Sequence, residues 1–590
     1  MVSYNKEGGG SRMTQSAEQT GRMLFDLLRQ WGDGLLRLQA DLPGVPELDG
    51  GILCPACRMI HGRCHEAVYP LLFLAERTGE KRYLTAAKKL FRWGENMLCA
   101  DGSLRNDAKS DWRGITVFGA VALHDALYYH GALLCEEEKR GWAARLARMG
   151  EWLYENLRPG RLQAYLNYYA ANACAMALLG AYFRREDYRA LARELAGFCF
   201  AHTSENLLLY GEGHPLDVRT AKGCLAVDAG GYNPEETLPS LTRYARTAGD
   251  MPALERCRAL WKAQLLWMLP DGAWDDSVGS RAFKWSWWGS RTADGCQDAL
   301  FTLGRQDPVF AEAALRNAAL YGRCTRDGLL YGGPDYFRRG EKSCVHHTFC
   351  RAKTLAGTLN GGVYDFERVS LPVEEASGIV RFGELDLLRV SFGGWLADIS
   401  GYDHLPFPGA HASGGAVSLL FHRKTGPLIA CGAADYRIKE PQNQQLPSDP
   451  QTHRSPCPRL ETVIDGVRYG QHYDPRAGID GRKDEDGVTV RVSAYLCDDR
   501  GGRTPGPGDC ALEYVFRADS LLIRGRVAVE IAERTRYILP LIGGAVRPKL
   551  LRGTAGDGPR PFFNLNPGFA GTEYSLCPDR VGVFELLIEV

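Results

Sequence analysis

The 590-residue chain carries 71 Lys and Arg against 71 Asp and Glu, so it has no net formal charge. An acidic partner would therefore have to be held by a local basic patch, and nucleic-acid binding is disfavoured as the main role. The composition, 45% hydrophobic and 24% charged, is ordinary for a globular protein, and the length allows two or more domains. No apolar run is long enough to suggest a membrane span.

The N-terminus lacks the basic-then-apolar layout of a signal peptide, and residues 1–20 are predicted to form a flexible extension. Most of the 18 cysteines lie inside apolar helical patterns, as Cys174, Cys199 and Cys296 do. That placement suits reduced, packed thiols better than a disulfide framework. These features favour a cytoplasmic location.

Helical periodicity dominates residues 21–365, in more than ten segments of similar length that Gly, Pro or Asp separates. Short-linked helical pairs of this kind predict a ring of hairpins rather than a globin-like bundle. From 366 to 590 the pattern changes to short β-rich runs separated by turn residues, which predicts an antiparallel β-sandwich. The expected ligand site is a cleft between these two domains.

On a helix, Tyr165, Tyr168, Tyr169, Asn172 and Met176 would share one face. The plain interpretation of this face is packing in the core, with the Asn hydrogen-bonded there. Alternatively, Asn172 could present its amide to a substrate carboxylate, with Tyr168 beside it as a substrate contact.

The stretch GYNPEETLPSLTRYA starts another helix, with Asn233 as N-cap, Pro234 at the first position and Glu236 completing a capping-box-like arrangement. Tyr232 directly precedes this helix, where the positive end of the helix dipole would favour a phenolate. Tyr232 is therefore a catalytic candidate, although a hydrophobic contact at the helix entrance would also explain it.

Three cations, Arg281, Lys284 and Arg291, alternate with four tryptophans in residues 271–295. Aromatic faces can stack on sugar rings, while Arg and Lys bind carboxylate or sulfate. The segment is therefore expected to be a long substrate-binding loop that uses the three cations and Trp285. Burial of the tryptophans, with the charges at the rim, is the alternative.

Four histidines lie in two further motifs: His346 and His347 in CVHHTFC, and His404 and His411 in DHLPFPGAHASGG. His347 is a candidate substrate contact. His411 lies in a loop of small residues before a strand, so its ring is expected to be accessible, with a pKa suited to proton transfer near neutral pH.

Cys54, Cys57, His61 and Cys64 are candidate ligands of a structural divalent metal. C-x2-C is half of a zinc knuckle, and further ligands follow within a few residues. A second, distant pair is not evident in the sequence, and no cofactor is expected to be required.

In chain order, CPACRMIHGRC, NYYAAN, GYNPEETLPSLTRYA, KWSWWGSRTADGCQ, HHTFCRAK and GAHASGG resemble motifs of the heparinase II/III-like polysaccharide lyases. Within that superfamily the resemblance is to broad-acting glycosaminoglycan lyases related to alginate lyases. It implies an α+β multidomain fold: an incomplete (α/α) toroid followed by an antiparallel β-sandwich, with the active site between them. It also implies β-elimination on uronic-acid-containing glycans, such as heparan sulfate, chondroitin sulfate, hyaluronan or alginate.

The resemblance also implies roles for a catalytic trio. Asn172 would neutralise the uronate carboxylate, and Tyr232 and His411 would serve as base and acid. Tyr244 competes with Tyr232, because the catalytic Tyr of alginate-lyase relatives lies deeper in this motif. Many relatives bind zinc through His-x-His on the sandwich loop; here Ser413 takes the second place, with Asp435 and His453 downstream.

Two other functions compete with the lyase interpretation. An unsaturated uronyl hydrolase or another glycoside hydrolase on the same toroid would need two carboxylates, for which Asp275 or Asp276 with Glu235 could be proposed. A non-enzymatic carbohydrate-binding protein would use the tryptophans but leave Tyr232 and His411 without a role. The lyase interpretation leads. The expected partner is an anionic polysaccharide or oligosaccharide, with no nucleic-acid or membrane role.

Overall fold

A computed structural model describes residues 13–107, 110–441 and 443–590. Residues 1–12, most of the predicted flexible extension, lie outside the described chain. Ordered structure begins inside that predicted extension, because strand β1 occupies Thr14–Gln15 and helix α1 starts at Ala17. Among the described helices, none has both the length and the apolar character that crossing a membrane requires.

The first part of the chain is helical. Its α-helices are α1 (Ala17–Leu38), α2 (Val68–Thr78), α3 (Lys81–Trp93), α4 (Thr116–His130), α5 (Glu136–Asn156), α6 (Leu166–Tyr182), α7 (Glu186–Ala201), α8 (Leu238–Ala248), α9 (Met251–Gln264), α10 (Gln297–Gly304), α11 (Pro308–Arg323), α12 (Val345–Gly361) and the short α13 (Pro372–Glu375).

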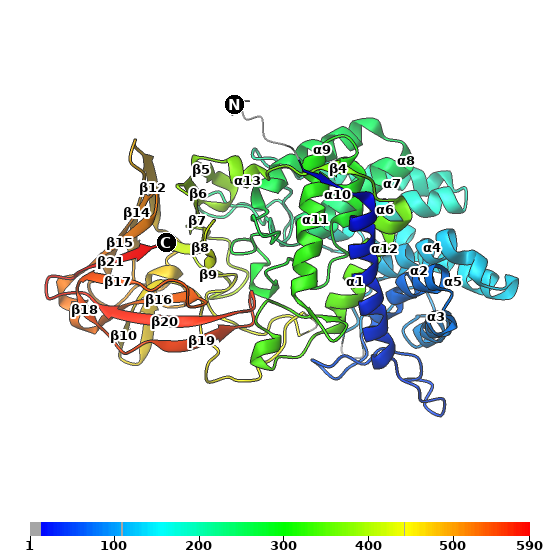
Figure 1. Cartoon of the computed structure of the whole chain (residues 1–590), viewed down its shortest axis with the longest axis horizontal. Helices are drawn as coiled ribbons and strands as arrows, with labels where there is room; N and C mark the ends of the chain where they lie inside the picture. Colours follow the sequence, from blue (N-terminus) through cyan, green and yellow to red (C-terminus); the bar gives the residue numbers. More distant parts are fainter. Residues whose placement is uncertain (1–12, 108–109, 442) are drawn as a thin grey trace.

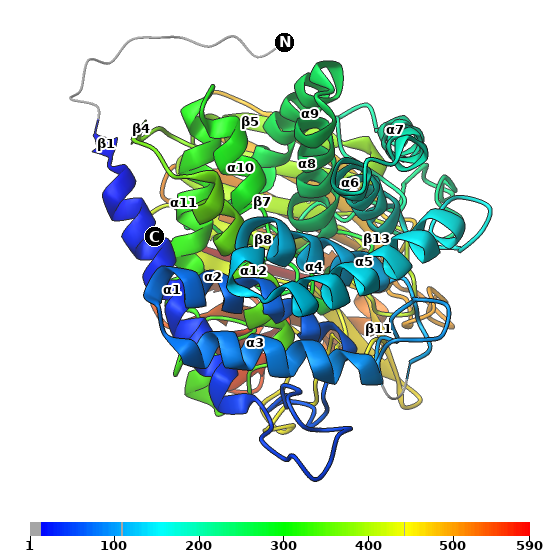
Figure 2. The same cartoon turned by 90° about the vertical axis from the view of Figure 1, so that its right-hand side faces the viewer.

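These helices form a toroid of hairpins (Figure 2). The inner helices α2, α4, α6, α8, α10 and α12 contact one another in that order, and α12 returns to α2. The outer helices α3, α5, α7, α9 and α11 each pack on the inner helix before them in sequence, and α1 packs on α12. The predicted ring of helical hairpins is confirmed.

The amino-acid pattern explains which helices lie inside the ring. Helix α6 (LNYYAANACAMALLGAY) is buried along most of its length, and its alanines leave room for neighbours on every side. Helix α3 instead buries one stripe, from Tyr83 to Trp93 at helical spacing. A helix that is apolar all round belongs in an interior, whereas an amphipathic helix covers a surface.

The second part of the chain is built from antiparallel strands. They are β5 (Gly378–Phe382), β6 (Leu387–Phe392), β7 (Trp395–Ser400), β8 (Ala416–His422), β9 (Gly426–Ala430), β10 (Arg459–Ile464), β11 (Val467–Gly470), β12 (Gly478–Lys483), β13 (Val488–Tyr495), β14 (Asp509–Arg517), β15 (Ser520–Val527), β16 (Thr535–Ile542), β17 (Lys549–Arg552), β18 (Thr554–Ala555), β19 (Arg560–Asn564), β20 (Phe569–Cys577) and β21 (Val583–Glu589). Three short strands lie outside this part: β2 (Thr325–Arg326), β3 (Leu329–Leu330) and β4 (Phe366–Glu367), which pairs with β1.

The strands form three sheets around one apolar core. One sheet has the order β5-β6-β7-β8-β9 and another β12-β13-β14-β15-β21-β17. In the third, of order β11-β10-β16-β20-β18, β19 also pairs with β20. All three sheets contribute residues to a shared core, including Val390, Tyr514 and Leu539. The β5–β9 sheet lies nearest the helices (Figure 1). The predicted boundary after residue 365 falls between the end of α12 and the start of β5.

A buried ion cluster joins the two parts. Arg389 on β6 donates to both oxygens of Asp398 on β7, at 2.8 and 2.6 Å, and also pairs with Asp275 from the helical part. Its guanidinium lies 4.2 Å from the ring centroid of Trp267. Burial and the neighbouring Asp398 raise the pKa of Asp275 well above its usual range. Arg389 therefore compensates two carboxylates that have no access to water.

Arg389→Met should lower the free energy of unfolding by about 3–5 kcal/mol, because it leaves buried carboxylates without their cation. Urea unfolding at neutral pH measures this loss. Arg524→Met is the matched control: Arg524 lies half-exposed and pairs with Glu513 at 3.1 Å on the surface, so its loss should cost less than about 1 kcal/mol. Equal costs for the two variants would contradict the structural importance of the Arg389 cluster.

Candidate active-site cleft

A cleft of about 370 Å³ opens between the toroid and a loop of the sandwich. Residues that line it include Tyr165, Asn167, Tyr168, His214, Tyr232 and Arg281 from the toroid and Glu440 from the loop between β9 and β10. Both domains border this cleft, which is where the sequence analysis expects a ligand to bind. Its lining combines aromatic rings with cations.

Tyr232 is held rigidly at the entrance of a helix. It precedes a five-residue π-helix, Asn233–Thr237, that runs directly into α8. Its backbone N–H donates to Asp228 Oδ2 at 2.6 Å, and the indole N–H of Trp285 donates to Asp228 Oδ1 at 2.9 Å. The Trp285 ring meets the tyrosine ring edge-on, with 4.8 Å between centroids. Asp228 and Trp285 thus fix the position of Tyr232.

The Tyr232 hydroxyl lies among charges. Lys284 Nζ donates to it at 3.3 Å, and the Arg281 guanidinium is 5.4 Å from the ring centroid. Both cations pair with Glu440. Burial raises the pKa of Tyr232 well above its usual value, against the opposing effect of Arg281. Burial and the neighbouring Arg281 lower the pKa of Lys284 to about 8.

These pKa values define the protonation states near neutral pH. Tyr232 is a neutral phenol, and Lys284 remains largely an ammonium. The phenol can give up a proton, and the ammonium is placed to stabilise the phenolate that would result.

Tyr244, the competing tyrosine, points elsewhere. It is buried within α8, and its hydroxyl donates to Asp250 Oδ2 at 3.0 Å. It does not line the cleft. Of the two alternatives, only Tyr232 can reach a ligand bound there.

The prediction for Asn172 is wrong. Its amide is fully buried and donates to Leu157 O at 2.7 Å, which ties α6 to the end of α5. Asn167, five positions earlier on the same helix, lines the cleft instead. Five residues turn a helix by roughly 140° beyond a full circle, so the two amides face different neighbours. Among the described residues, the side-chain oxygen of Asn167 has no hydrogen-bond partner.

The prediction for His411 is also wrong. The ring is buried, donates from Nε2 to His404 O at 2.6 Å and stacks on Tyr402 with 4.7 Å between centroids. Burial lowers its pKa to about 3, and it does not line the cleft. His214, which the sequence analysis passed over, lines the cleft and stacks on Tyr165 at 4.6 Å. Partial burial and Arg281 lower its pKa, so it is neutral at neutral pH.

The predicted substrate contacts divide into two groups. Arg281 and Tyr168 line the cleft, and their contact with substrate stays a prediction. Lys284, Trp285, Arg291 and His347 are buried and do not line it.

Arg291 and His347 are held by contacts within the protein. Arg291 donates to Tyr336 OH at 2.6 Å and to a backbone carbonyl of the sandwich. The His347 ring packs edge-on against Trp288 at 5.5 Å. The tryptophans of this segment are buried as well, so it fills the space between the domains instead of forming an open loop.

The carboxylates proposed for a hydrolase lie away from the cleft. Asp275 pairs with Arg389, and Asp276 is buried. Glu235 pairs with Arg351 at 2.5 Å and accepts from Tyr321 OH. None of the three carboxylates lines the cleft. The hydrolase proposal therefore loses its candidate acid and base.

A larger cavity of about 500 Å³ lies within the sandwich and carries arginines paired with carboxylates. Asp435, on its wall, pairs with Arg468 at 2.7 Å, while His453 Nε2 accepts from Leu565 N at 3.1 Å. The Ser413 hydroxyl donates to the backbone carbonyl of Asp474 at 3.4 Å. Among the described residues, Asp435 and His453 are not part of a group of possible metal ligands.

The metal ligands predicted near the N-terminus meet only in part. Cys54 and His61 lie together with Cys344, and Cys57 borders them. Cys64 is packed in the apolar core of the toroid and is not part of the group. The thiols of the described chain are free, as the sequence predicted.

Comparison with known proteins places this architecture in a family. The family models described as ulvan lyase N-terminal domain and ulvan lyase C-terminal domain match residues 28–370 and 379–547. A broad-specificity ulvan lyase from Formosa agariphila is 35% identical over 528 residues, which is 88% of this chain and 82% of that protein.

Solved structures are similar at low sequence identity, and one of them shows the same fold. A chondroitin AC lyase from Streptomyces coelicolor A3, in complex with chondroitin sulphate, gives a TM-score of 0.54 at 12% identity and covers 96% of this chain and 79% of its own. A heparan sulfate lyase HepC mutant from Pedobacter heparinus gives a TM-score of 0.48 at 10% identity. That match covers 95% of this chain and 82% of the HepC chain. The chondroitin AC lyase structure confirms the predicted toroid-and-sandwich fold class, and the family matches confirm that the chain is a polysaccharide lyase. The chain belongs to the ulvan lyase family and is a polysaccharide lyase.

Proposed function

We propose that this enzyme cleaves ulvan by β-elimination at a uronic-acid residue, in the cleft around Tyr232. The relative from Formosa agariphila is named for ulvan, which favours this polymer over the glycosaminoglycans and alginate expected from the sequence. The observation that carries the proposal is the phenol of Tyr232, held between Lys284 and Arg281 in a cleft that both domains border.

Neutralisation of the uronate carboxylate comes first, because the proton on C5 is held firmly while that carboxylate keeps its full charge. Arg281 and Asn167 line the cleft and are the groups proposed for this role. Hydrogen bonds from a guanidinium or amide strengthen as negative charge builds up in the enolate-like transition state. Glu440 pairs with Arg281 in this structure, so the substrate carboxylate would compete with it.

The lowered pKa of His214 and the raised pKa of Tyr232 suggest which group accepts a proton and which donates one. A neutral His214 can accept the C5 proton, and a neutral Tyr232 can donate its proton to the departing glycosidic oxygen. The C5–H and C4–O bonds break, a C4–C5 double bond forms, and no water is consumed. Lys284 stabilises the Tyr232 phenolate until the proton on His214 is returned through solvent.

Incubation with ulvan should give products with a C4–C5 double bond and rising ultraviolet absorbance, without incorporation of oxygen from labelled water. Heparan sulfate, chondroitin sulfate, hyaluronan and alginate, tested in parallel, define the range of polymers. Saturated products that carry solvent oxygen would indicate hydrolysis. A double bond formed only from one of the other polymers would retain the elimination chemistry and refute ulvan as substrate.

Tyr232→Phe should abolish turnover while the fold is kept, because the change removes only the hydroxyl that donates the proton. Tyr244→Phe, the matched control, should leave kcat within a few-fold of wild type. Initial rates of ultraviolet absorbance change and thermal melting report on both variants. An active Tyr232→Phe enzyme beside an inactive Tyr244→Phe enzyme would reverse the assignment.

His214→Gln should lower kcat on the order of 10²–10⁴-fold, the range for loss of a general base. His411→Gln keeps a donor for His404 O and should retain most activity. In wild type, kcat/KM should fall as pH drops through the pKa of His214, which lies below 6.5, because the base becomes protonated. The pH–rate profile of each variant measures this, and His214→Gln should lose that acid limb. If His214→Gln stays active, His346, which also lines the cleft, becomes the next candidate.

A further inference from the structure

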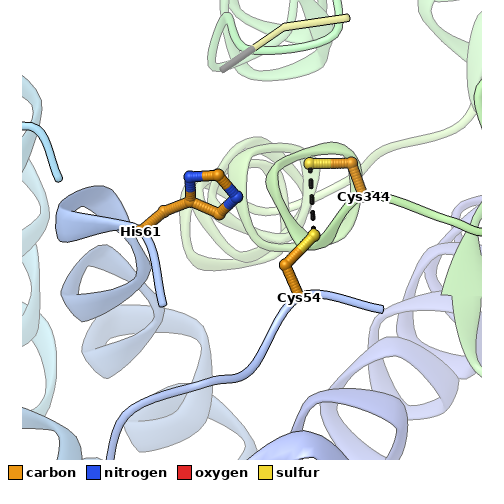
Figure 3. Close-up of side chains that lie close together, drawn as sticks. All are labelled: Cys54, His61 and Cys344. Carbon is orange, nitrogen blue, oxygen red and sulfur yellow. Dashed lines mark hydrogen bonds between the residues drawn. The ribbon is translucent and has the colours of Figure 1, made fainter. Parts of the chain in front are cut away.

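Two segments that are distant in sequence, the turn 54–61 and the start of α12, bring metal-binding side chains together beside the cleft (Figure 3). One ligand atom from each of Cys54, His61 and Cys344 lies within 4.8 Å of the other two. The Cys54 and Cys344 sulfurs are 3.7 Å apart, although the residues are 290 positions apart in the chain. Cys57 Sγ lies 3.0 Å from His61 Nε2, and its side chain also hydrogen-bonds Cys54.

A tight turn makes the first part of this cluster. Leu53 and Ile60 pair as an antiparallel bridge, and the Arg58 N–H donates to Cys54 O at 2.9 Å. Arg58 adopts a positive φ of 57°, which closes the turn. The turn carries Cys54, Cys57 and His61, and C-x2-C in a tight turn is the geometry of a zinc knuckle.

The remaining ligand comes from the toroid's last inner helix. Cys344 is the N-cap of α12, and its sulfur lies against that of Cys54. The sequence prediction selected Cys64 because it is near in the chain. Cys344 takes its place because the ring of helices brings α12 back to the N-terminal segment.

The spacing of Cys54 and Cys344 fits a tetrahedral zinc ion, whereas Cys57 Sγ lies outside the group of ligand atoms that are all within 4.8 Å of one another and has to move closer on binding. With zinc–sulfur bonds of about 2.3 Å, two ligand sulfurs lie roughly 3.8 Å apart, close to the Cys54–Cys344 separation. A disulfide would need about 2.05 Å. Three cysteines and one histidine are a common ligand set for zinc in closed, structural sites.

The charges around the cluster distinguish it from a second group of similar composition. Glu66, Asp294 and Cys350 also lie close together, but Lys353 pairs with both carboxylates and Arg63 with both as well. Those two cations already occupy the place of a metal. Among the described residues, no Lys or Arg ion pair or hydrogen bond to Cys54, Cys57 or Cys344 is seen.

We propose that Cys54, Cys57, His61 and Cys344 bind one zinc ion, which ties the N-terminal turn to helix α12. Binding would release the thiol protons as three thiolates and neutral His61 Nε2 take up the metal. Four protein ligands leave no position open for water, so the site is structural. The His61 ring packs on His346 at 4.1 Å, and His346 lines the cleft, so the metal would steady one wall of the active site.

Metal analysis of the purified, reduced protein tests the proposal. About one zinc per chain is expected, and cobalt substitution should give the thiolate-to-cobalt charge-transfer band of a sulfur-rich tetrahedral site. Cys344→Ser should lose most of this metal. Cys64→Ser, which removes another buried thiol of the same segment, should keep it.

Thermal melting gives a readout that does not depend on catalysis. Chelation under reducing conditions should lower the Tm of wild type, and added zinc should restore it. If Cys344→Ser fails to fold, Cys57→Ser and the wild-type measurements still decide the question. Metal-free wild type, or mass spectra that show a disulfide within the cluster, would overturn the proposal. Tyr232→Phe should lose turnover but keep its zinc. A failed zinc measurement would therefore leave the proposed lyase mechanism untouched, and the reverse also holds.

Discussion

The active-site cleft depends on charges that are removed from water and paired across the two domains. Glu440, from the sandwich, pairs with Arg281 and Lys284, which come from the toroid and contact Tyr232. Charges held in low dielectric are tolerated only with a partner, and here the partner belongs to the other domain. The sandwich therefore supplies the carboxylate that the two buried cations beside Tyr232 need.

The fold and part of the cleft could be predicted from the sequence. A change of hydrophobic period separates helices from strands, and a tyrosine at a helix entrance needs only local reasoning. Asn172 shows where such reasoning ends. On an amphipathic helix the polar residue marks the exposed face, but α6 is an inner helix with no exposed face. Which of its two asparagines meets the cleft depends on neighbours that only the closed ring supplies.

The predictions that His411 and the tryptophans are accessible to a ligand were wrong for a related reason. The small residues before β8 predicted an open loop. In the structure they instead let neighbouring backbone pack closely against this segment. A Cβ on Gly414 would lie 1.6 Å from Gln471 O, so glycine there lets the chain pack tightly. Likewise, four tryptophans look like sugar platforms in isolation, but all are buried: Trp274, Trp285, Trp287 and Trp288. Trp287 packs on Phe569 of the sandwich, whereas Trp288 packs on Tyr321 of the toroid. Burial by segments that are distant in the chain leaves no local signal in a single sequence.

The ring of inner helices has a consequence for biosynthesis. Helix α2 completes its packing only when α12 contacts it, and α1 also waits for α12. The first helices to leave the ribosome would therefore expose apolar faces until residues 345–361 have been made. Pairing of such distant segments is slow, and it lengthens the time in which a nascent chain can aggregate. Demand for chaperones during synthesis should accordingly be greatest before α12 emerges, well before the sandwich is translated.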